Sequence, residues 1–182
     1  EYRLAIPQTN SYNRTHPLSG ERIAALNDVY AKSPYFRKGP DAVFQARFLR
    51  IKGKLIGYIE DPKRTLVMFP ASDQSVQARY ARAYAWQRSA YPDAAIGEVD
   101  KLLIGAPNDP YFLELKGQIL LESGRNKEAI PVLRKAVANA PNEPLIATLL
   151  GHALISTEMP ADLAEAKPLL KAAIARDKDN PF

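Results

Sequence analysis

The chain contains no cysteine, only two histidines, His16 and His152, and a single tryptophan, Trp86. Without cysteine, a disulfide scaffold, a thiolate metal site and a cysteine nucleophile are excluded. Two histidines that lie far apart in the sequence also exclude a self-contained HExxH zinc helix. The sequence contains no run of about 18 apolar residues, so no candidate membrane span is expected.

Other sequence signs of catalysis are missing as well. Gly53 and Gly57 stand alone within a helical pattern and do not form a glycine-rich phosphate loop. Glu98 and Asp100 are two residues apart on an expected helix and point to different faces, so they are no acid/base pair. His152 has no expected metal-binding partner. We therefore expect a binding protein rather than an autonomous enzyme.

The 182 residues suffice for one domain or a short repeat array, and they carry a net charge of +5. Residues 1–100 hold 15 Lys and Arg against 10 Asp and Glu, whereas residues 101–182 hold 10 of each. The basic residues are densest at Arg37, Lys38, Arg47, Arg50, Lys52, Lys54, Lys63 and Arg64. They indicate either a solvated helical face or a surface for an acidic partner. No nucleic-acid reader module accompanies them, so nucleic acid is not an expected partner.

Internal repeats occupy the second half of the chain. Similar junctions lie 34 and then 37 residues apart, at Asn108-Asp109-Pro110, Asn142-Glu143-Pro144 and Asp179-Asn180-Pro181. Between the junctions, the segment 128–133 matches the segment 165–170. The longer second offset predicts three extra residues in the last inter-helix turn, near Met159.

A 34-residue period with this content resembles the tetratricopeptide repeat (TPR), a pair of antiparallel helices. The best copy spans Pro110 to Glu143, with Leu113, Gly117 and Leu120 on the first helix and Ala129, Leu133 and Ala136 on the second. Gly117 and Ala129 would let the two helices approach closely, and Gly124 would supply a left-handed residue where the first helix stops. The resemblance implies an all-α, right-handed TPR superhelix of antiparallel helix pairs.

Further helices are expected upstream, and no strand. A degenerate copy contains Ala83, Trp86, Ala95 and Pro107, with helices over 80–86 and 92–104. The segment Asp41–Gly57 and a short helix over 62–68 form an atypical, capping-like repeat. One more helix is expected over Ser19–Lys32, with Ile23, Leu26 and Tyr30 on one face.

These elements predict three regions. Residues 1–18 form an extended segment, residues 19–72 the N-terminal helices with the capping repeat, and residues 73–182 an array of about three TPRs.

The first helix of each TPR is expected to line a concave groove. By position the lining residues would be Gln77, Tyr80, Tyr84, Gln87, Arg88, Tyr111, Glu114, Gln118, Thr148 and His152. Exposed aromatic and Arg side chains there would suit peptide binding. The alternative is that these positions are ordinary solvated helix faces. Trp86 is expected in the core between helices.

A second resemblance starts at Thr15-His16-Pro17-Leu18-Ser19 and continues through Arg22-Ile23. This segment is similar to the one that closes the catalytic domain in HExxH zinc metalloproteases of the HtpX and CAAX-protease superfamily. The downstream segments 52–58, 61–66, 80–83 and 111–120 resemble the linker and repeats of the periplasmic, TPR-bearing BepA-like proteases. The likeness covers the chain from about Thr15 onward.

This resemblance implies that the zinc ligands, two histidines and a glutamate, lie upstream in a parent protein. No catalytic residue, metal or cofactor is then expected in this chain, and zinc belongs to the parent protease domain. The segment left from the end of that domain would be residues 1–18, and His16 would be a zinc-proximal gate in the intact parent. Since the chain starts at Glu1 without Met, we expect a processed product or an excised fragment.

The sequence and the resemblance together predict a protein-interaction domain of a bacterial periplasmic zinc metalloprotease in envelope protein quality control. Its expected partners are its own protease domain and unfolded or outer-membrane client proteins or assembly factors, held in a chaperone-like way. The alternative is a standalone TPR-like adaptor or scaffold whose basic face binds an acidic partner. Exposed Leu4, Ile6 and the first helix would also favour a dimer when the protease domain is absent.

Overall fold

The structure of the chain is a computed structural model that describes residues 19–36, 38–39 and 41–177. Contacts divide the chain into two compact units, residues 1–42 and residues 43–182, which are described separately. Our expectations for residues 1–18, including the role of His16, lie outside the described residues. The region boundaries that we placed at 18/19 and 72/73 stay predictions.

The described part of the first unit contains helix α1, Ser19–Ala31. It ends one residue before the predicted helix end and leaves Ile23, Leu26 and Tyr30 exposed. The Tyr30 ring meets the Phe36 ring edge-on, with the centroids 5.1 Å apart.

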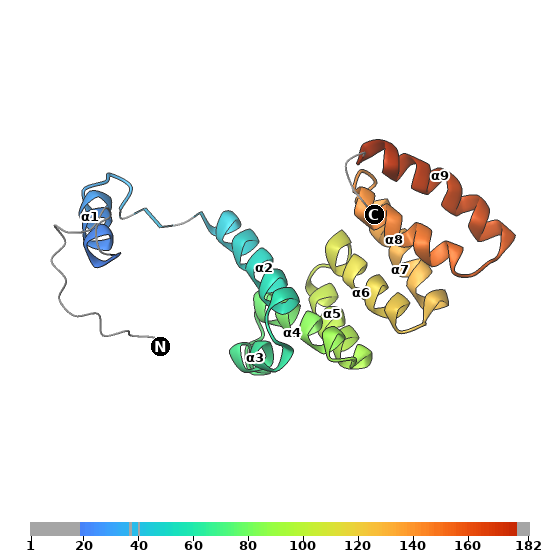
Figure 1. The fold of residues 1–182 in the computed structure, drawn as a ribbon, viewed down its shortest axis with the longest axis horizontal. Helices are drawn as coiled ribbons and strands as arrows, with labels where there is room; N and C mark the ends of the chain where they lie inside the picture. Colours follow the sequence, from blue (N-terminus) through green and yellow to red (C-terminus); the bar gives the residue numbers. More distant parts are fainter. Residues whose placement is uncertain (1–18, 37, 40, 178–182) are drawn as a thin grey trace. The chain divides into compact units, whose positions relative to one another are not determined.

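The second unit contains three successive antiparallel helix pairs (Figure 1). Their bounds are α4 Val76–Arg88, α5 Pro92–Gly105, α6 Pro110–Glu122, α7 Asn126–Asn139, α8 Pro144–Ile155 and α9 Pro160–Arg176. Each second helix also packs against the first helix of the next pair, and α6 touches α8 directly. The described residues form no strand. The predicted all-α TPR architecture is therefore confirmed.

The helix ends repeat at the sequence period. Ser75 and Asp109, 34 residues apart, are the N-caps of α4 and α6, and the side chain of each accepts a backbone N–H of the first turn. The first helices are followed by residues with positive φ at Ala90, Gly124 and Glu158, with values of 61°, 77° and 57°. The prediction for Gly124 is confirmed, and the same left-handed stop recurs at both equivalent positions without glycine.

Close packing within each pair also repeats. A Cβ added at Gly117 would lie 2.3 Å from the Leu133 side chain, and one at Gly151 would lie 2.4 Å from Leu170. The first helix therefore has no side chain where the second helix inserts a leucine. In the α4–α5 pair the same positions hold Ala83 and Val99. Alanine is larger than the glycine of the other pairs, and valine is correspondingly smaller than their leucine.

We expected the three extra residues of the last repeat in the turn between its two helices. That expectation is wrong, because they lie in the second helix. Helix α9 has 17 residues against 14 in α7, and it begins at Pro160. Proline fits the first turn of a helix, and Asp162 in that turn accepts a hydrogen bond from the Thr157 hydroxyl at 2.7 Å. The insertion therefore lengthens α9 at its start.

Helices α2, Ala42–Ile59, and α3, Pro62–Met68, precede the array. Helix α2 lies backbone to backbone on α4, because a Cβ at Gly53 would fall 2.4 Å from the Gln77 carbonyl oxygen and one at Gly57 2.6 Å from that of Ala81. The two glycines, which we assigned only to a helical pattern, are therefore the packing surface of α2.

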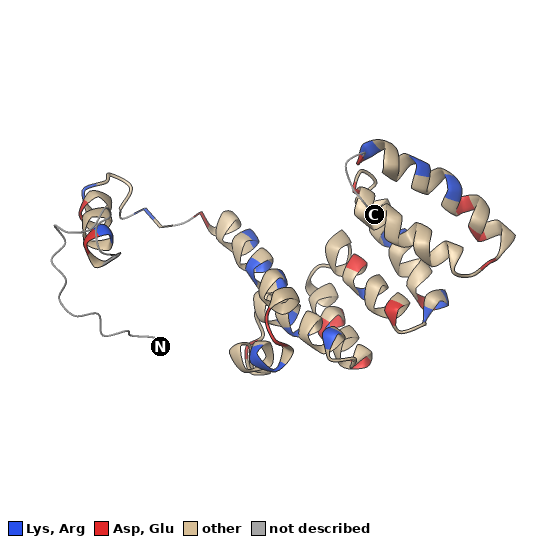
Figure 2. Ribbon diagram, in the orientation of Figure 1, with Lys and Arg blue, Asp and Glu red and all other residues tan. Residues whose placement is uncertain are grey.

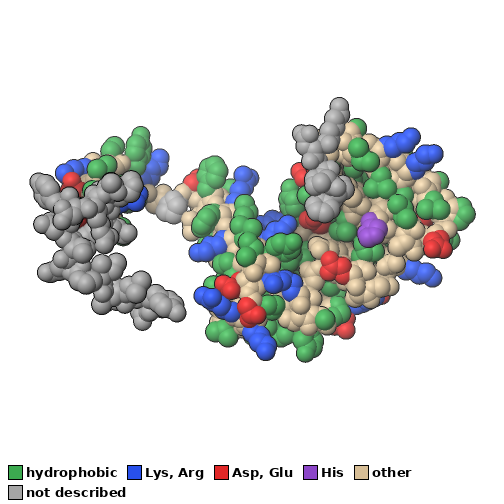
Figure 3. All heavy atoms as spheres, in the orientation of Figure 1, with side chains coloured by type: hydrophobic (Ala, Val, Ile, Leu, Met, Phe, Trp, Pro, Cys, Tyr) green, Lys and Arg blue, Asp and Glu red, His purple; other side chains and the backbone are tan. Residues whose placement is uncertain are grey.

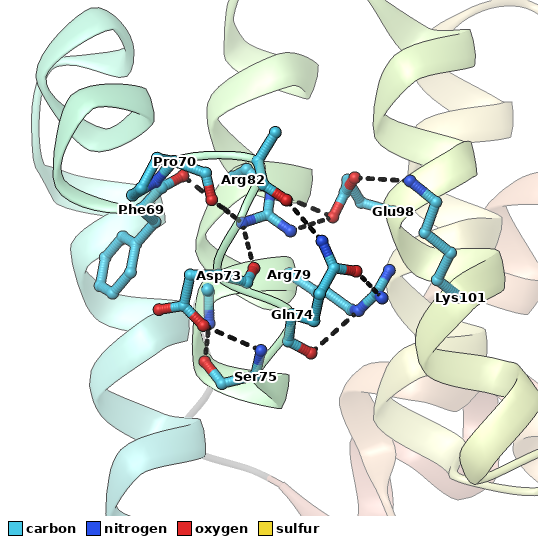
Figure 4. Close-up of polar contacts among 11 residues, drawn as sticks. Phe69, Pro70, Asp73, Gln74, Ser75, Arg79, Arg82, Glu98 and Lys101 are labelled. Atoms are coloured by element: carbon cyan, nitrogen blue, oxygen red, sulfur yellow. Dashed lines mark hydrogen bonds and ion pairs between the residues drawn. The ribbon is translucent and has the colours of Figure 1, made fainter.

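Arg82 of α4 forms a buried ion pair with Glu98 of α5 and also bonds to the α3–α4 loop, so one side chain connects the loop to α5 (Figure 4). The Arg82 guanidinium donates to Glu98 Oε2 at 2.7 and 3.1 Å, and to the carbonyl oxygens of Pro70 at 2.9 Å and Asp73 at 2.7 Å. Lys101 donates to the other Glu98 oxygen at 2.9 Å. Sequence reasoning missed this network, because nothing in the spacing of Arg82 and Glu98 marks them as partners.

Candidate functional site

A hollow of about 390 Å³ lies where α2, α4 and α6 meet. Its lining combines cationic and apolar side chains from the three helices: Arg47, Arg50, Ile51, Lys54, Tyr80 and Tyr111. Helix α2 itself carries four cations and no acidic residue (Figure 2). We call this site the basic hollow.

Arg50 is the fixed part of the basic hollow. Its guanidinium forms a bidentate ion pair with the Asp109 carboxylate, with N–O distances of 2.5 Å and 2.6 Å. The guanidinium carbon Cζ lies 4.2 Å from the centroid of the Phe112 ring. Burial disfavours the charged guanidinium, but its hydrogen bonds to Asp109 and the negative charge of that carboxylate outweigh burial and raise the pKa of Arg50. Since Asp109 also caps α6, one carboxylate sets both the start of α6 and the position of α2.

Tyr80 of α4 forms the floor beneath Arg50, and the Tyr84 ring lies next to the Tyr80 ring. Tyr80 and Tyr84 are only 2% and 5% exposed and belong to one apolar cluster with Phe112. Burial raises the pKa of the Tyr80 hydroxyl to about 12 and also raises that of Tyr84. The expectation of two exposed rings on α4 is therefore corrected, and Tyr111 is the exposed ring of the hollow.

Glu114 of α6 is half-buried next to the hollow. Burial raises the pKa of its carboxyl, the nearby Lys54 lowers it, and Glu143 adds a further rise. The group thus titrates above its usual range in a site where cations outnumber it. An acidic ligand that approached Arg47 and Lys54 would face more positive charge when Glu114 is protonated.

Several other groove candidates are held by contacts within the fold. Arg88 donates to the carbonyl oxygens of Gly57 and Glu60 and so caps the end of α2. Gln87 and Gln118 both donate to the Glu122 carboxylate, at 2.6 and 2.8 Å. Gln87 therefore joins α4 to α6, whereas Gln118 bonds within α6.

The remaining candidates lie apart from the hollow. Thr148 donates its hydroxyl to the Pro144 carbonyl, His152 is exposed on α8, and Gln77 packs its backbone under Gly53. Whether the ten groove positions bind a partner stays a prediction. Trp86 is partly buried against the predicted inter-helix core.

The structure adds residues that our groove prediction lacked. Arg47, Arg50, Ile51 and Lys54 come from α2, which precedes the repeats and was excluded by counting positions from the repeat alone. A signal existed in the sequence, because the basic cluster on this helix already indicated an acidic partner. The basic cluster of α2 and the predicted groove residues Tyr80 and Tyr111 line the same hollow.

Over residues 19–36, 38–39 and 41–177, no group of three or more His, Asp or Glu side chains is placed to hold a metal ion. None of the helices in the described part of the chain is long and apolar enough to cross a membrane.

The described array has the fold of a TPR-type helical repeat protein. The solved chain titled "MamA RS-1 ArsTM double mutant", itself a TPR-type protein, matches it with a TM-score of 0.58 and 23% sequence identity. The match covers 74% of this chain and 76% of that one, and at this identity it shows the fold alone. No protein-family model and no curated protein matches the chain.

Proposed function

We propose that this chain is a protein-interaction domain and that the basic hollow beside α2 is its binding site. The observation that carries the proposal is the meeting of three cations with an exposed aromatic ring in one hollow. Arginine and tyrosine dominate protein-binding hot spots when a rigid scaffold holds them. Here the Arg50–Asp109 pair and the glycine contact of α2 with α4 supply that rigidity.

We further propose that the domain belongs to a longer bacterial periplasmic zinc metalloprotease of the BepA-like type. The support is the sequence resemblance from about Thr15 onward. The domain would then hold clients or outer-membrane assembly partners near the protease domain, in envelope protein quality control. The zinc and all catalytic residues would come from the upstream domain.

The parentage is tested by the coding DNA upstream of Glu1. We expect an in-frame HExxH motif followed by a glutamate codon, behind a signal peptide. A start codon close to Glu1 would instead support the second candidate, a free-standing adaptor whose basic face binds an acidic partner. The basic hollow favours neither, since both need a binding surface.

Binding at the hollow is tested by site-specific photo-crosslinking in cells that express the full-length protein. A photoreactive amino acid at Tyr111 is expected to give a discrete protein adduct, which mass spectrometry identifies. The matched control is Ile104 on α5, which is strongly exposed and outside the hollow. Equal adducts at the two positions would remove the hollow as the binding site.

A further inference from the structure

The outer face of α2 is apolar and exposed, the reverse of the usual amphipathic arrangement. Phe48, Ile51, Leu55 and Tyr58 are 58%, 59%, 51% and 63% exposed. Their spacing of three, four and three residues places them on one stripe of the helix, away from the glycines that pack on α4. At its edge the stripe reaches the array, because Ile51 lines the basic hollow and the Tyr58 ring meets the Tyr84 ring edge-on. We call this stripe the α2 seam; Figure 3 shows hydrophobic side chains along α2 with basic ones beside them.

The spacing of the α2 seam is that of a coiled-coil core. With Phe48 and Leu55 at position a, Ile51 and Tyr58 fall at position d. The flanking positions, which choose the partner in coiled coils, then hold Arg47 and Lys54 at g, and Lys52 and the exposed Ile59 at e. Every charged residue that borders the seam is therefore positive.

We propose that the α2 seam docks an amphipathic helix of a partner protein whose flanking positions are acidic. The inference rests on the proposed function and names the chemistry of its partner. Charge complementarity selects this occupant, because carboxylates beside the partner's apolar stripe would meet Arg47, Lys52 and Lys54. Arg47 and Lys54 also line the basic hollow, so one flank of the docked helix would enter it.

The same charges disfavour a second copy of this chain. In a parallel pair, position g of one helix faces position e of the other, and in an antiparallel pair g faces g. Both arrangements place cations against cations on α2.

The test uses the purified 182-residue chain and two labelled helical peptides of about three heptads with identical Leu cores. One peptide carries Glu at every e and g position and the other carries Lys, so neither pairs well with itself. Fluorescence anisotropy is expected to show the Glu peptide binding at least about tenfold tighter, with the difference shrinking at high salt. Equal affinities, or no binding of either peptide, would overturn the proposal.

Three variants separate docking from damage to the fold. Arg47→Glu with Lys52→Glu should invert the preference, so that the Lys peptide becomes the tighter ligand. Leu55→Ser should abolish binding, whereas Ile104→Ser, at an exposed apolar position outside the seam, should leave it unchanged. Circular dichroism checks that each variant keeps its helices. An unaltered preference in the Arg47 and Lys52 variant contradicts the charge argument.

Other occupants are measured alongside. A Leu55-dependent dimer in sedimentation analysis, or Leu55-dependent binding to phosphatidylglycerol vesicles without peptide binding, would replace the proposed helix by a second copy or a lipid surface. If the peptides fail to bind while Tyr111 still crosslinks a protein in cells, only the inference about the seam is lost. If Tyr111 gives no specific adduct, the proposed function itself fails.

Discussion

Helix α2 and the first helices of the last two pairs, α6 and α8, use glycine and apolar residues in opposite ways. In α6 and α8, glycines accommodate leucine side chains from the partner helix, and the apolar side chains lie inside. In α2, glycines meet the backbone of α4, and the large apolar side chains lie outside. The regular pairs thus bury their own apolar side chains. Helix α2 instead packs through its glycines and leaves its large apolar side chains exposed to solvent.

The difference shows that the array could stack without α2, but α2 needs the array for its position. Its attachments are largely polar or steric: the Arg50–Asp109 pair, the Arg88 cap and the glycine contacts. Few apolar side chains join them, namely Ile56 against α4 and the Tyr58 ring edge-on to Tyr84. A helix held this way is fixed in place while its apolar side remains open to a partner.

The largest effect is expected at the buried ion pair that fastens the α3–α4 loop to the array. The Arg82 side chain is 4% exposed, so Arg82→Met removes the donor to Glu98 Oε2 and to three loop carbonyls. We expect a loss of about 3–5 kcal/mol in the free energy of unfolding, measured by urea denaturation. The control Lys101→Met removes a solvent-exposed partner of the same carboxylate and should cost under about 1 kcal/mol. Similar losses in the two variants would contradict the buried role of Arg82.

A pH series on Glu98→Gln tests the same network from its acidic side. Burial raises the pKa of Glu98, but hydrogen bonds from Lys101 and Arg82 outweigh it, so the folded-state pKa is lowered. Ionised Glu98 therefore contributes stability above its unfolded pKa of about 4.3, and this contribution is lost as the pH falls through the folded value. We expect Glu98→Gln to cost about 1.5–3 kcal/mol at neutral pH. A gap to the wild type that widened on acidification would show that the sign is wrong.

Alanine substitution at three glycines compares the two regions directly. Gly57→Ala would drive a methyl group into the α4 backbone, which cannot rotate away, and should cost about 1–3 kcal/mol. Gly117→Ala meets only the Leu133 side chain and should cost less. Gly97→Ala on α5 meets nothing within 4 Å and should stabilise the chain by up to about 1 kcal/mol, because alanine favours the helix. Equal thermal shifts for Gly57→Ala and Gly117→Ala would erase the distinction between the regions.

The regular pairs were predictable from the sequence because their period repeats both residue type and local chemistry. The left-handed stop at Gly124 depends on neighbours in the sequence, and the close approach at Gly117 follows from its position in the repeat. The position of α2 was not predictable in the same way. Its contacts join Arg50 to Asp109 and Gly57 to Ala81, across distances at which the sequence carries no spacing rule.

The basic hollow was predicted only in part for the same reason. Tyr111 and Glu114 were found by counting repeat positions, but counting cannot report that Tyr80 and Tyr84 become covered once α2 packs across α4. The cations of α2 were visible in the sequence as a cluster. Their meeting with the repeat surface required the tertiary structure.

The smallest expected effect concerns the turns inside the regular pairs, where the period is the same but the residue differs. Ala90 and Glu158 adopt the left-handed conformation that Gly124 adopts at the equivalent position. A side chain in that conformation costs about 1–2 kcal/mol, partly offset because glycine loses more entropy on folding. We therefore expect Glu158→Gly to stabilise the chain by about 1 kcal/mol or less, and Gly124→Ala to destabilise it by a similar amount, in thermal denaturation. Because nothing lies within 4 Å of a Cβ at Gly124, a loss there reports backbone strain alone. Destabilisation by both substitutions would mean that side-chain contacts at position 158, and not the shared turn geometry, decide stability at these turns.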